Sequence, residues 1–141
     1  TQDTFAFGPP LILDGKLCEK VDEDRVGRIN PRAGLGLVEP GHFVAIVVDG
    51  RLPHYSHGLL LSDFAKLFEK EGCVMAYNLD GGASTAMIFM GEQINTHSGQ
   101  RLGASNDISY QRAVPDGLMF GFSEQVPSVD DPVLNDGNNG N

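Results

Sequence analysis

The order of apolar runs between residues 43 and 79 constrains the fold of this chain more than any other feature. Two runs, "FVAIVV" at 43–48 and "CVMAYNL" at 73–79, have the length and composition of buried strands. The second run shows no alternation of polar and apolar residues, which predicts a strand covered on both faces. A helical segment separates the runs, and a strand–helix–strand crossover almost always leaves its two strands parallel in one sheet.

The segment between these runs, "LLLSDFAKLFEKEG", predicts one amphipathic helix. Phe64, Leu67 and Phe68 share a face at helical spacing. Ser62 is the expected N-cap residue, and Gly72 is placed to end the helix.

Turn residues predict three hairpins around this unit. Asp14-Gly15 interrupts an apolar segment, and an Asp-Gly pair in that setting is the strongest short-range hairpin signal. The three expected hairpins cover 11–17, 32–48 and 86–95, and "LMFGF" at 118–122 predicts a last strand. The sequence thus indicates a mixed α/β (α+β) fold whose mixed sheet contains a βαβ unit and several hairpins, with one main amphipathic helix.

Length and composition predict a single domain followed by a tail. The chain has 141 residues, of which 40% are hydrophobic, enough for one core and too few for two. From Ser123 the chain fills with Asn, Asp, Gly and Pro and loses apolar periodicity. We therefore expect a domain over 1–122 and a flexible polar tail over 123–141.

Charge and apolar run length exclude two classes of partner. The formal net charge is -9, so a polyanion such as nucleic acid would meet a repulsive field. The apolar runs are far shorter than the roughly 20 residues that span a bilayer, so no membrane span is predicted. Cys18 and Cys73 are compatible with one disulfide or with two thiols.

Charged residues cluster where the parallel strands are expected to end. Asp49 follows the run at 43–48, and Asp80 follows the run at 73–79. Ligands in such units bind beyond the carboxyl ends of the strands, so both carboxylates should emerge at one sheet edge. Arg32, at the start of the folded-back hairpin strand, should lie at the same edge.

The residue types at this edge suit the hydrolysis of an anionic substrate. Carboxylates on adjacent strands would lie about 5 Å apart, or about 10 Å apart with one strand between, a span that covers glycosidase acid–base pairs. Arg32 and Arg51 can bind phosphate or carboxylate oxygens. The turn "GGAST" adds close main-chain approach at Gly81 and Gly82 and hydroxyls at Ser84 and Thr85.

Structural interpretations of the same residues stay open. An aspartate after a strand is often only a turn residue, and Ser84 and Thr85 can cap a turn. His54 and His57 have no third ligand at a useful spacing, so no metal is predicted, and no cofactor is predicted either.

Several separate blocks resemble one known family. "NPRAGLGL", "AIVVDGR", "YSHGLLLSDFAKLF" and "YNLDGGASTAMIFMGEQIN" occur in the order found in the phosphodiester glycosidase family, and the resemblance runs from about Phe7 to Phe122. It implies a hydrolase that removes an α-linked sugar, typically N-acetylglucosamine, from a phosphodiester. It also implies a glycoconjugate or cell-envelope polysaccharide, such as an exopolysaccharide, as substrate.

The resemblance also assigns site residues. It implies catalytic roles for Asp80 first and Asp49 as its partner, with the acid, base or nucleophile assignment left open. Ala83 stands where the family usually has a third glycine, which puts the conformation of this turn in question. The residues implied to bind substrate are Asn78, Gly81, Gly82, Ser84, Asn95, Arg32 and Arg112, to which the edge argument adds Arg51 and Thr85.

Family members carry a further segment ahead of the equivalent of "GPPLILDG". We therefore expect the apolar residues 5–13 to lie against another polypeptide, in a homo-oligomer or with an N-terminal fragment of the same domain. The family also implies an extracellular, periplasmic or cell-envelope location. The alternatives are a catalytically silent carbohydrate- or sugar-phosphate-binding module and a plain structural domain of an envelope protein.

Overall fold

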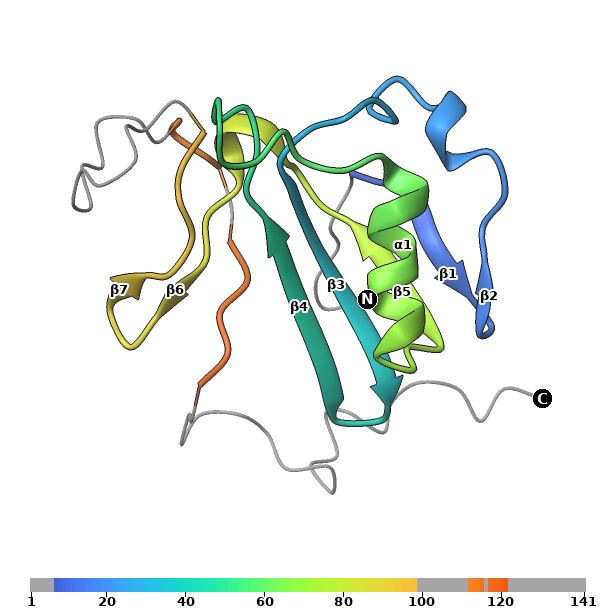
Figure 1. Ribbon diagram of the computed structural model, residues 1–141. Coiled ribbons are helices and arrows are strands. Elements are labelled where there is room, and N and C mark those ends of the chain that lie inside the picture. Colours follow the sequence, from blue (N-terminus) through green and yellow to red (C-terminus); the bar gives the residue numbers. More distant parts are fainter. Residues whose placement is uncertain (1–6, 99–111, 116, 122–141) are drawn as a thin grey trace.

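A computed structural model describes residues 7–98, 112–115 and 117–121 of the chain, and Figure 1 shows its arrangement. A five-stranded sheet carries one helix on one face, and a two-stranded hairpin projects from one end, so the mixed α/β fold is confirmed. The elements are β1 Pro10–Leu13, β2 Lys16–Leu17, the 3-10 helix η1 Val21–Glu23, β3 Arg32–Glu39, β4 His42–Val48, α1 Leu61–Lys70, β5 Met75–Asn78, the 3-10 helix η2 Gly82–Ser84, β6 Ile88–Phe89 and β7 Glu92–Gln93.

The strand order is β2-β1-β5-β3-β4. Strand β3 pairs antiparallel with β4 on one side and with β5 on the other, so β4 and β5 run parallel with β3 between them. This confirms the parallel relationship predicted from the crossover and places one strand between the two.

All three predicted hairpins are present. Asp14 and Gly15 both have positive φ (50° and 72°), as do Met90 and Gly91 (51° and 86°), which is the backbone of a two-residue type I′ turn. Strands β6 and β7 are shorter than predicted, because pairing is confined to Ile88–Phe89 and Glu92–Gln93.

The predicted helix is present, but its predicted N-cap is wrong. Helix α1 begins at Leu61, so Ser62 lies inside it, and its own N–H donates to Asp22 Oδ1 at 2.9 Å. A carboxylate from η1 thus provides the cap that sequence reasoning assigned to the local serine. At the other end Gly72 has φ 76°, and Gly72 N–H and Cys73 N–H donate to Glu69 O and Phe68 O, which completes a Schellman motif.

The core lies between α1 and one face of the sheet. Phe64 and Phe68 are fully buried and pack edge to face, with ring centroids 5.2 Å apart. Two glycines of β3 make room for them: a Cβ at Gly34 would lie 2.9 Å from Phe64, and one at Gly36 would lie 2.7 Å from Phe68. The helix therefore packs closely on this strand, because β3 carries no side chain where the phenyl rings lie.

Cys18 and Cys73 are free thiols, so of the two alternatives the structure shows two thiols and no disulfide between them. Burial raises the pKa of the Cys73 thiol. Leu11 and Ile12 are buried in the chain's own core, and β1 pairs with β5 and β2. Leu11 and Ile12 therefore pack against their own chain, and a contact of segment 5–13 with another polypeptide stays a prediction.

The second face of the sheet is apolar and has little cover among the described residues. The register places Leu35, Leu37, Phe43, Ala45, Met75 and Tyr77 on this face, and every one of them is half-buried or exposed. The prediction that 73–79 is covered on both faces is therefore wrong for the described part of the chain. Both faces of the sheet are apolar here, but α1 covers only one of them.

The described part of the predicted last strand, 118–121, is not in a strand. It contacts the sheet through Phe120, whose ring lies 6.2 Å from that of Phe43, instead of through backbone pairing. Residue 122 and the predicted tail, 123–141, lie outside the described residues. No helix in the described part of the chain is long and apolar enough to cross a membrane.

Candidate active site

The candidate site lies at the end of the sheet where β3 begins and β4 and β5 end, at the top of Figure 1. Arg32 pairs with Val48, and the N–H of Leu79 donates to Ala33 O at 2.9 Å. Asp49, Asp80 and Arg32 therefore emerge at one sheet edge, as the crossover and the hairpin predict.

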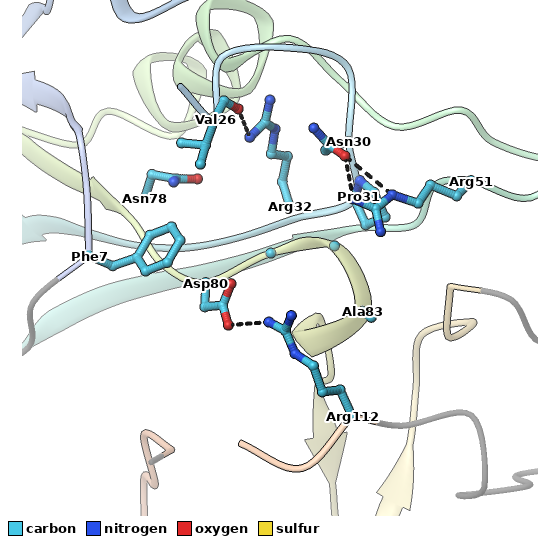
Figure 2. Close-up of a pocket in the computed structure, with 12 residues that line it drawn as sticks. Phe7, Val26, Asn30, Pro31, Arg32, Arg51, Asn78, Asp80, Ala83 and Arg112 are labelled. Atoms are coloured by element: carbon cyan, nitrogen blue, oxygen red, sulfur yellow. Dashed lines mark hydrogen bonds and ion pairs between the residues drawn. The ribbon is translucent and has the colours of Figure 1, made fainter. Parts of the chain in front are cut away.

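A pocket of about 160 Å³ opens at this edge (Figure 2). It combines a carboxylate with three guanidinium groups and the backbone of the Gly81–Ala83 turn. Its lining residues are Phe7, Val26, Asn30, Pro31, Arg32, Arg51, Asn78, Asp80, Gly81, Gly82, Ala83 and Arg112. Seven of the predicted site residues line the pocket, whereas Asp49, Ser84, Thr85 and Asn95 do not.

Asp80 lines the pocket in an ion pair with Arg112. The Nη2 of Arg112 lies 2.7 Å from Asp80 Oδ2, and its Nε donates to Ser84 Oγ at 3.0 Å. Oδ1 of Asp80 and Nη1 of Arg112 have no hydrogen-bond partner in the described part of the chain. The pair thus keeps one carboxylate acceptor and one guanidinium nitrogen for a ligand, and Ser84 acts by orienting Arg112.

Hydrogen bonds to Asn30 hold the Arg51 side chain at the pocket. Its Nε and Nη2 donate to Asn30 Oδ1 at 3.2 and 2.7 Å. The guanidinium lies over Gly82, where a Cβ would come within 3.1 Å of Nη2. Sequence reasoning missed Asn30, although it lies in the block "NPRAGLGL" and its position before a proline marks a fixed turn.

Arg32 has a different environment from the other two arginines. It is 2% exposed and donates to Leu59 O at 2.9 Å, Val26 O at 2.8 Å and Gly27 O at 3.1 Å, and also to Arg28 O. Burial lowers the pKa of its guanidinium, and the nearby charge of Asp22 opposes this shift. Arg32 therefore fixes the 26–28 turn and places a positive charge at the pocket wall, with most of its donors used inside the chain.

The Gly81–Ala83 turn is tied to the start of β3. The N–H of Gly82 donates to Pro31 O at 3.0 Å, and a Cβ at Gly81 would lie 2.6 Å from that oxygen. Gly82 has φ 61°, whereas Ala83 lies in η2 without positive φ. The alanine at the third position is therefore compatible with this turn.

Two buried acceptors in this region lack a partner. Asn78 and Thr85 are each 1% exposed, and neither Asn78 Oδ1 nor Thr85 Oγ1 makes a hydrogen bond within the described part of the chain. The two differ in position, because Asn78 lines the pocket and Thr85 does not.

Asp49 binds loops of its own chain. Its carboxylate accepts hydrogen bonds from Tyr55 Oη at 3.1 Å, from Asn95 Nδ2 at 3.3 Å, and from Thr96 N–H at 3.0 and 3.1 Å. Asn95 also binds Thr85 O and Met87 N–H. Asp49 and Asn95 thus join the loop after β4 to the segment around β6 and β7, outside the pocket lining.

His97 is a buried residue for which the sequence indicated no role. It is 2% exposed, and its Nε2 lies 2.8 Å from Ala83 O, next to the pocket turn. Its sequence context, "NTHSGQR", carried no signal that distinguishes a buried imidazole from an exposed one. Among the described residues no group of three or more His, Cys, Asp or Glu side chains could hold a metal ion.

Fold and site together define an α/β protein with a pocket suited to an anionic ligand, in which a carboxylate lies among arginines. Residues 1–121 match the family model described as phosphodiester glycosidase, and the chain belongs to this family.

Individual proteins are similar to this chain in sequence or in fold. The chain is 32% identical over 125 residues to the SPbeta prophage-derived uncharacterized protein YomE of Bacillus subtilis (strain 168); the match covers 87% of this chain and 18% of that protein. The chain therefore spans about a fifth of the length of the curated relative that it matches.

Two solved structures share its fold. One is a hypothetical protein from Synechocystis, with TM-score 0.54 and 24% identity over 64% of this chain and 18% of that chain. The other is the zebrafish N-acetylglucosamine-1-phosphodiester alpha-N-acetylglucosaminidase catalytic domain, auto-inhibited by its pro-peptide, with TM-score 0.53 and 22% identity over 67% of this chain and 35% of that chain.

Proposed function

We propose that this chain carries the site of a glycosidase that hydrolyses the bond between an α-linked sugar, such as N-acetylglucosamine, and a phosphodiester. The observation that supports this most is the pocket in which Asp80 lies with Arg112 and Arg51. Arginine binds phosphate oxygens through planar, paired donors, and a carboxylate can act on water or on the sugar carbon.

The chemistry of the leaving group explains why one carboxylate can suffice. Hydrolysis breaks the bond between the sugar carbon and the phosphate oxygen and adds water to that carbon, and the phosphate departs as an anion. A phosphate monoester has a second pKa of about 6, so it leaves without the protonation that an alcohol requires. Arg112 and Arg51 stabilise its charge, and Asp80 is left to act as base or nucleophile.

Asp49 has a supporting role in this proposal. Within the described part of the chain, the hydrogen bonds to its carboxylate come from nearby loops, and Asp49 does not line the pocket. The sequence predicts Asp49 as the catalytic partner of Asp80. In place of that role, we propose that Asp49 holds the loop that carries Arg51. Asn95, which bridges the same two loops, acts with it.

The direct test is turnover of methyl α-N-acetylglucosamine 1-phosphodiester, followed by release of free sugar. Water labelled with heavy oxygen distinguishes two reactions: a glycosidase puts the label in the sugar, whereas a phosphodiesterase puts it in the phosphate. Label in the phosphate, or no turnover by folded protein, would contradict the proposal.

A sugar-phosphate-binding module without catalysis is the second candidate. It is favoured by the finding that Asp80 is the one carboxylate in the pocket lining among the described residues. Binding of the same phosphodiester without release of sugar would support it.

We further propose that the protein acts on a glycoconjugate or an exopolysaccharide in an extracellular, periplasmic or cell-envelope location. We also propose that the chain forms a homo-oligomer or associates with an N-terminal fragment of the same domain. Membership of the family supports the substrate. The exposed apolar face of the sheet supports the association, because uncovered apolar faces commonly mark contacts with other polypeptides.

A further inference from the structure

Asn78 lines the pocket and carries a buried acceptor without a partner in the described part of the chain. Its side chain is 1% exposed, and its Nδ2 donates to Gly8 O at 2.8 Å. That bond identifies which end of the amide is the nitrogen, so the other end, Oδ1, is the acceptor left without a partner. A buried acceptor without a partner destabilises the fold, which makes its position at a pocket wall informative.

The pocket is chemically uneven from one side to the other. Figure 2 shows Asn78 and Phe7 on one side, Arg51 and Arg112 on the other, and Asp80 between them. The guanidinium groups of Arg51 and Arg112 offer only donors, which suit the oxygens of an anion. The Asn78 side offers an acceptor beside an aromatic ring that is 44% exposed, which suits a ligand group with hydroxyl or amide donors and an apolar face.

We infer that Asn78 Oδ1 accepts a hydrogen bond from a sugar hydroxyl or amide N–H, so that the sugar lies on the Asn78 and Phe7 side and its phosphate on the Arg51 and Arg112 side. This inference rests on the proposed function and gives the substrate a direction in the site. The sugar-to-phosphate bond then lies beside Asp80. Asn78 acts as a specificity residue that favours a hydroxyl-bearing phosphate over an apolar one.

Two phosphates of similar size test the inference in the wild-type chain. Glucose 1-phosphate carries ring hydroxyls, whereas cyclohexyl phosphate has the same charge and a similar ring without them. Calorimetric titration should show about tenfold tighter binding of glucose 1-phosphate, the scale expected when a buried acceptor gains its partner. Equal affinities would overturn the inference, and this comparison needs no variant.

The variant Asn78→Leu assigns the preference to this residue. Leucine has nearly the shape of asparagine and offers no acceptor, so the preference should be lost while cyclohexyl phosphate still binds. Asn78→Ala, which adds no bulk, replaces it if circular dichroism shows that Asn78→Leu does not fold. A preference retained by the folded variant would overturn the inference.

Thr85→Val is the matched control. It removes the other unpartnered buried acceptor with a side chain of the same shape, and it lies outside the pocket lining. The preference for glucose 1-phosphate should persist in Thr85→Val; its loss there as well would show that any buried acceptor has this effect and would overturn the assignment to Asn78.

The outcomes for this inference and for the proposed function are separate. A preference that depends on Asn78, in a protein that releases no sugar from the phosphodiester, supports the inference and contradicts the proposed hydrolysis. Turnover of the phosphodiester together with equal binding of the two phosphates supports hydrolysis and overturns the inference.

Discussion

Arg112 and Asp80 are 32 residues apart in sequence, and their side chains meet in an ion pair of 2.7 Å at the pocket. The pair holds Oδ2 of Asp80 and leaves Oδ1 without a hydrogen-bond partner among the described residues.

The first prediction concerns Asp80. Asp80→Asn should lower turnover of the phosphodiester by about 10²–10⁴-fold, the usual contribution of a catalytic acid or base, and should leave the fold intact. Initial rates and a thermal melt measure both. Asp63→Asn, at an exposed aspartate paired with Lys66 in α1, is the control. Full activity of Asp80→Asn would remove this carboxylate from the mechanism.

Asp49 should respond differently. Because its carboxylate accepts four hydrogen bonds from Tyr55, Asn95 and Thr96, Asp49→Asn replaces an acceptor by a donor and should lower the free energy of unfolding by about 1–3 kcal/mol. Urea unfolding measures this loss. A large drop in turnover with unchanged stability would show that Asp49 is a catalytic partner of Asp80 after all.

Arg112 should act on the phosphate. Arg112→Ala should weaken binding of the phosphodiester about 10–100-fold, the range for a lost hydrogen bond to a charged group, and should affect a neutral methyl glycoside much less. Arg112→Lys should recover part of the loss, since it keeps the charge without the paired donors. Equal losses for the charged and the neutral ligand would argue against a phosphate role.

Arg32 should mainly stabilise the fold. Arg32→Met leaves the carbonyls of Val26, Gly27, Arg28 and Leu59 without their donor, which should cost about 3 kcal/mol or more in free energy of unfolding. The same change at the exposed Arg25 is the control. Wild-type stability of Arg32→Met, with weakened phosphate binding, would instead support the direct anion-binding role expected from the sequence.

Asp22 should make stability depend on pH. Hydrogen bonding from Ser62 lowers the pKa of this carboxyl in the folded chain, so its ionised form stabilises the fold above the ordinary carboxyl pKa, and this stability is lost as pH falls through the lowered value. Asp22→Ala should cost about 1 kcal/mol at neutral pH, as for other helix caps.

The control for Asp22 is Glu23→Ala in the same 3-10 helix, which should have little effect. Urea unfolding of wild type and Asp22→Asn should differ at neutral pH and converge below the range in which carboxyl groups titrate. A difference that stays constant across that range would contradict an electrostatic contribution from Asp22.

Local signals predicted much of the fold, because they act between neighbours in sequence. Asp14-Gly15 and Gly91 specify their turns through backbone conformation, and the crossover between 43–48 and 73–79 specifies parallel strands. The same topology was enough to bring Asp49, Asp80 and Arg32 to one edge.

The failures involve contacts between distant residues. Sequence alone could not show that Asp22 caps α1 in place of Ser62, or that Asp49 is already bound by Asn95 and Thr96. An aspartate at a strand end looks the same in sequence whether it faces a pocket or binds a loop. Asn30 was missed for the same reason, since its role depends on Arg51, 21 residues away.

The sheet face opposite α1 also governs how this chain behaves at high concentration. Phe43, Met75 and Ala45 expose apolar surface there, and β4 at the end of the strand order offers an edge to which another strand could add. At neutral pH the net charge of -9 keeps copies of the chain apart. Near the isoelectric point, about 4.7, this repulsion vanishes, so colloidal stability should be lowest in the mildly acidic range and purification is best kept well above it.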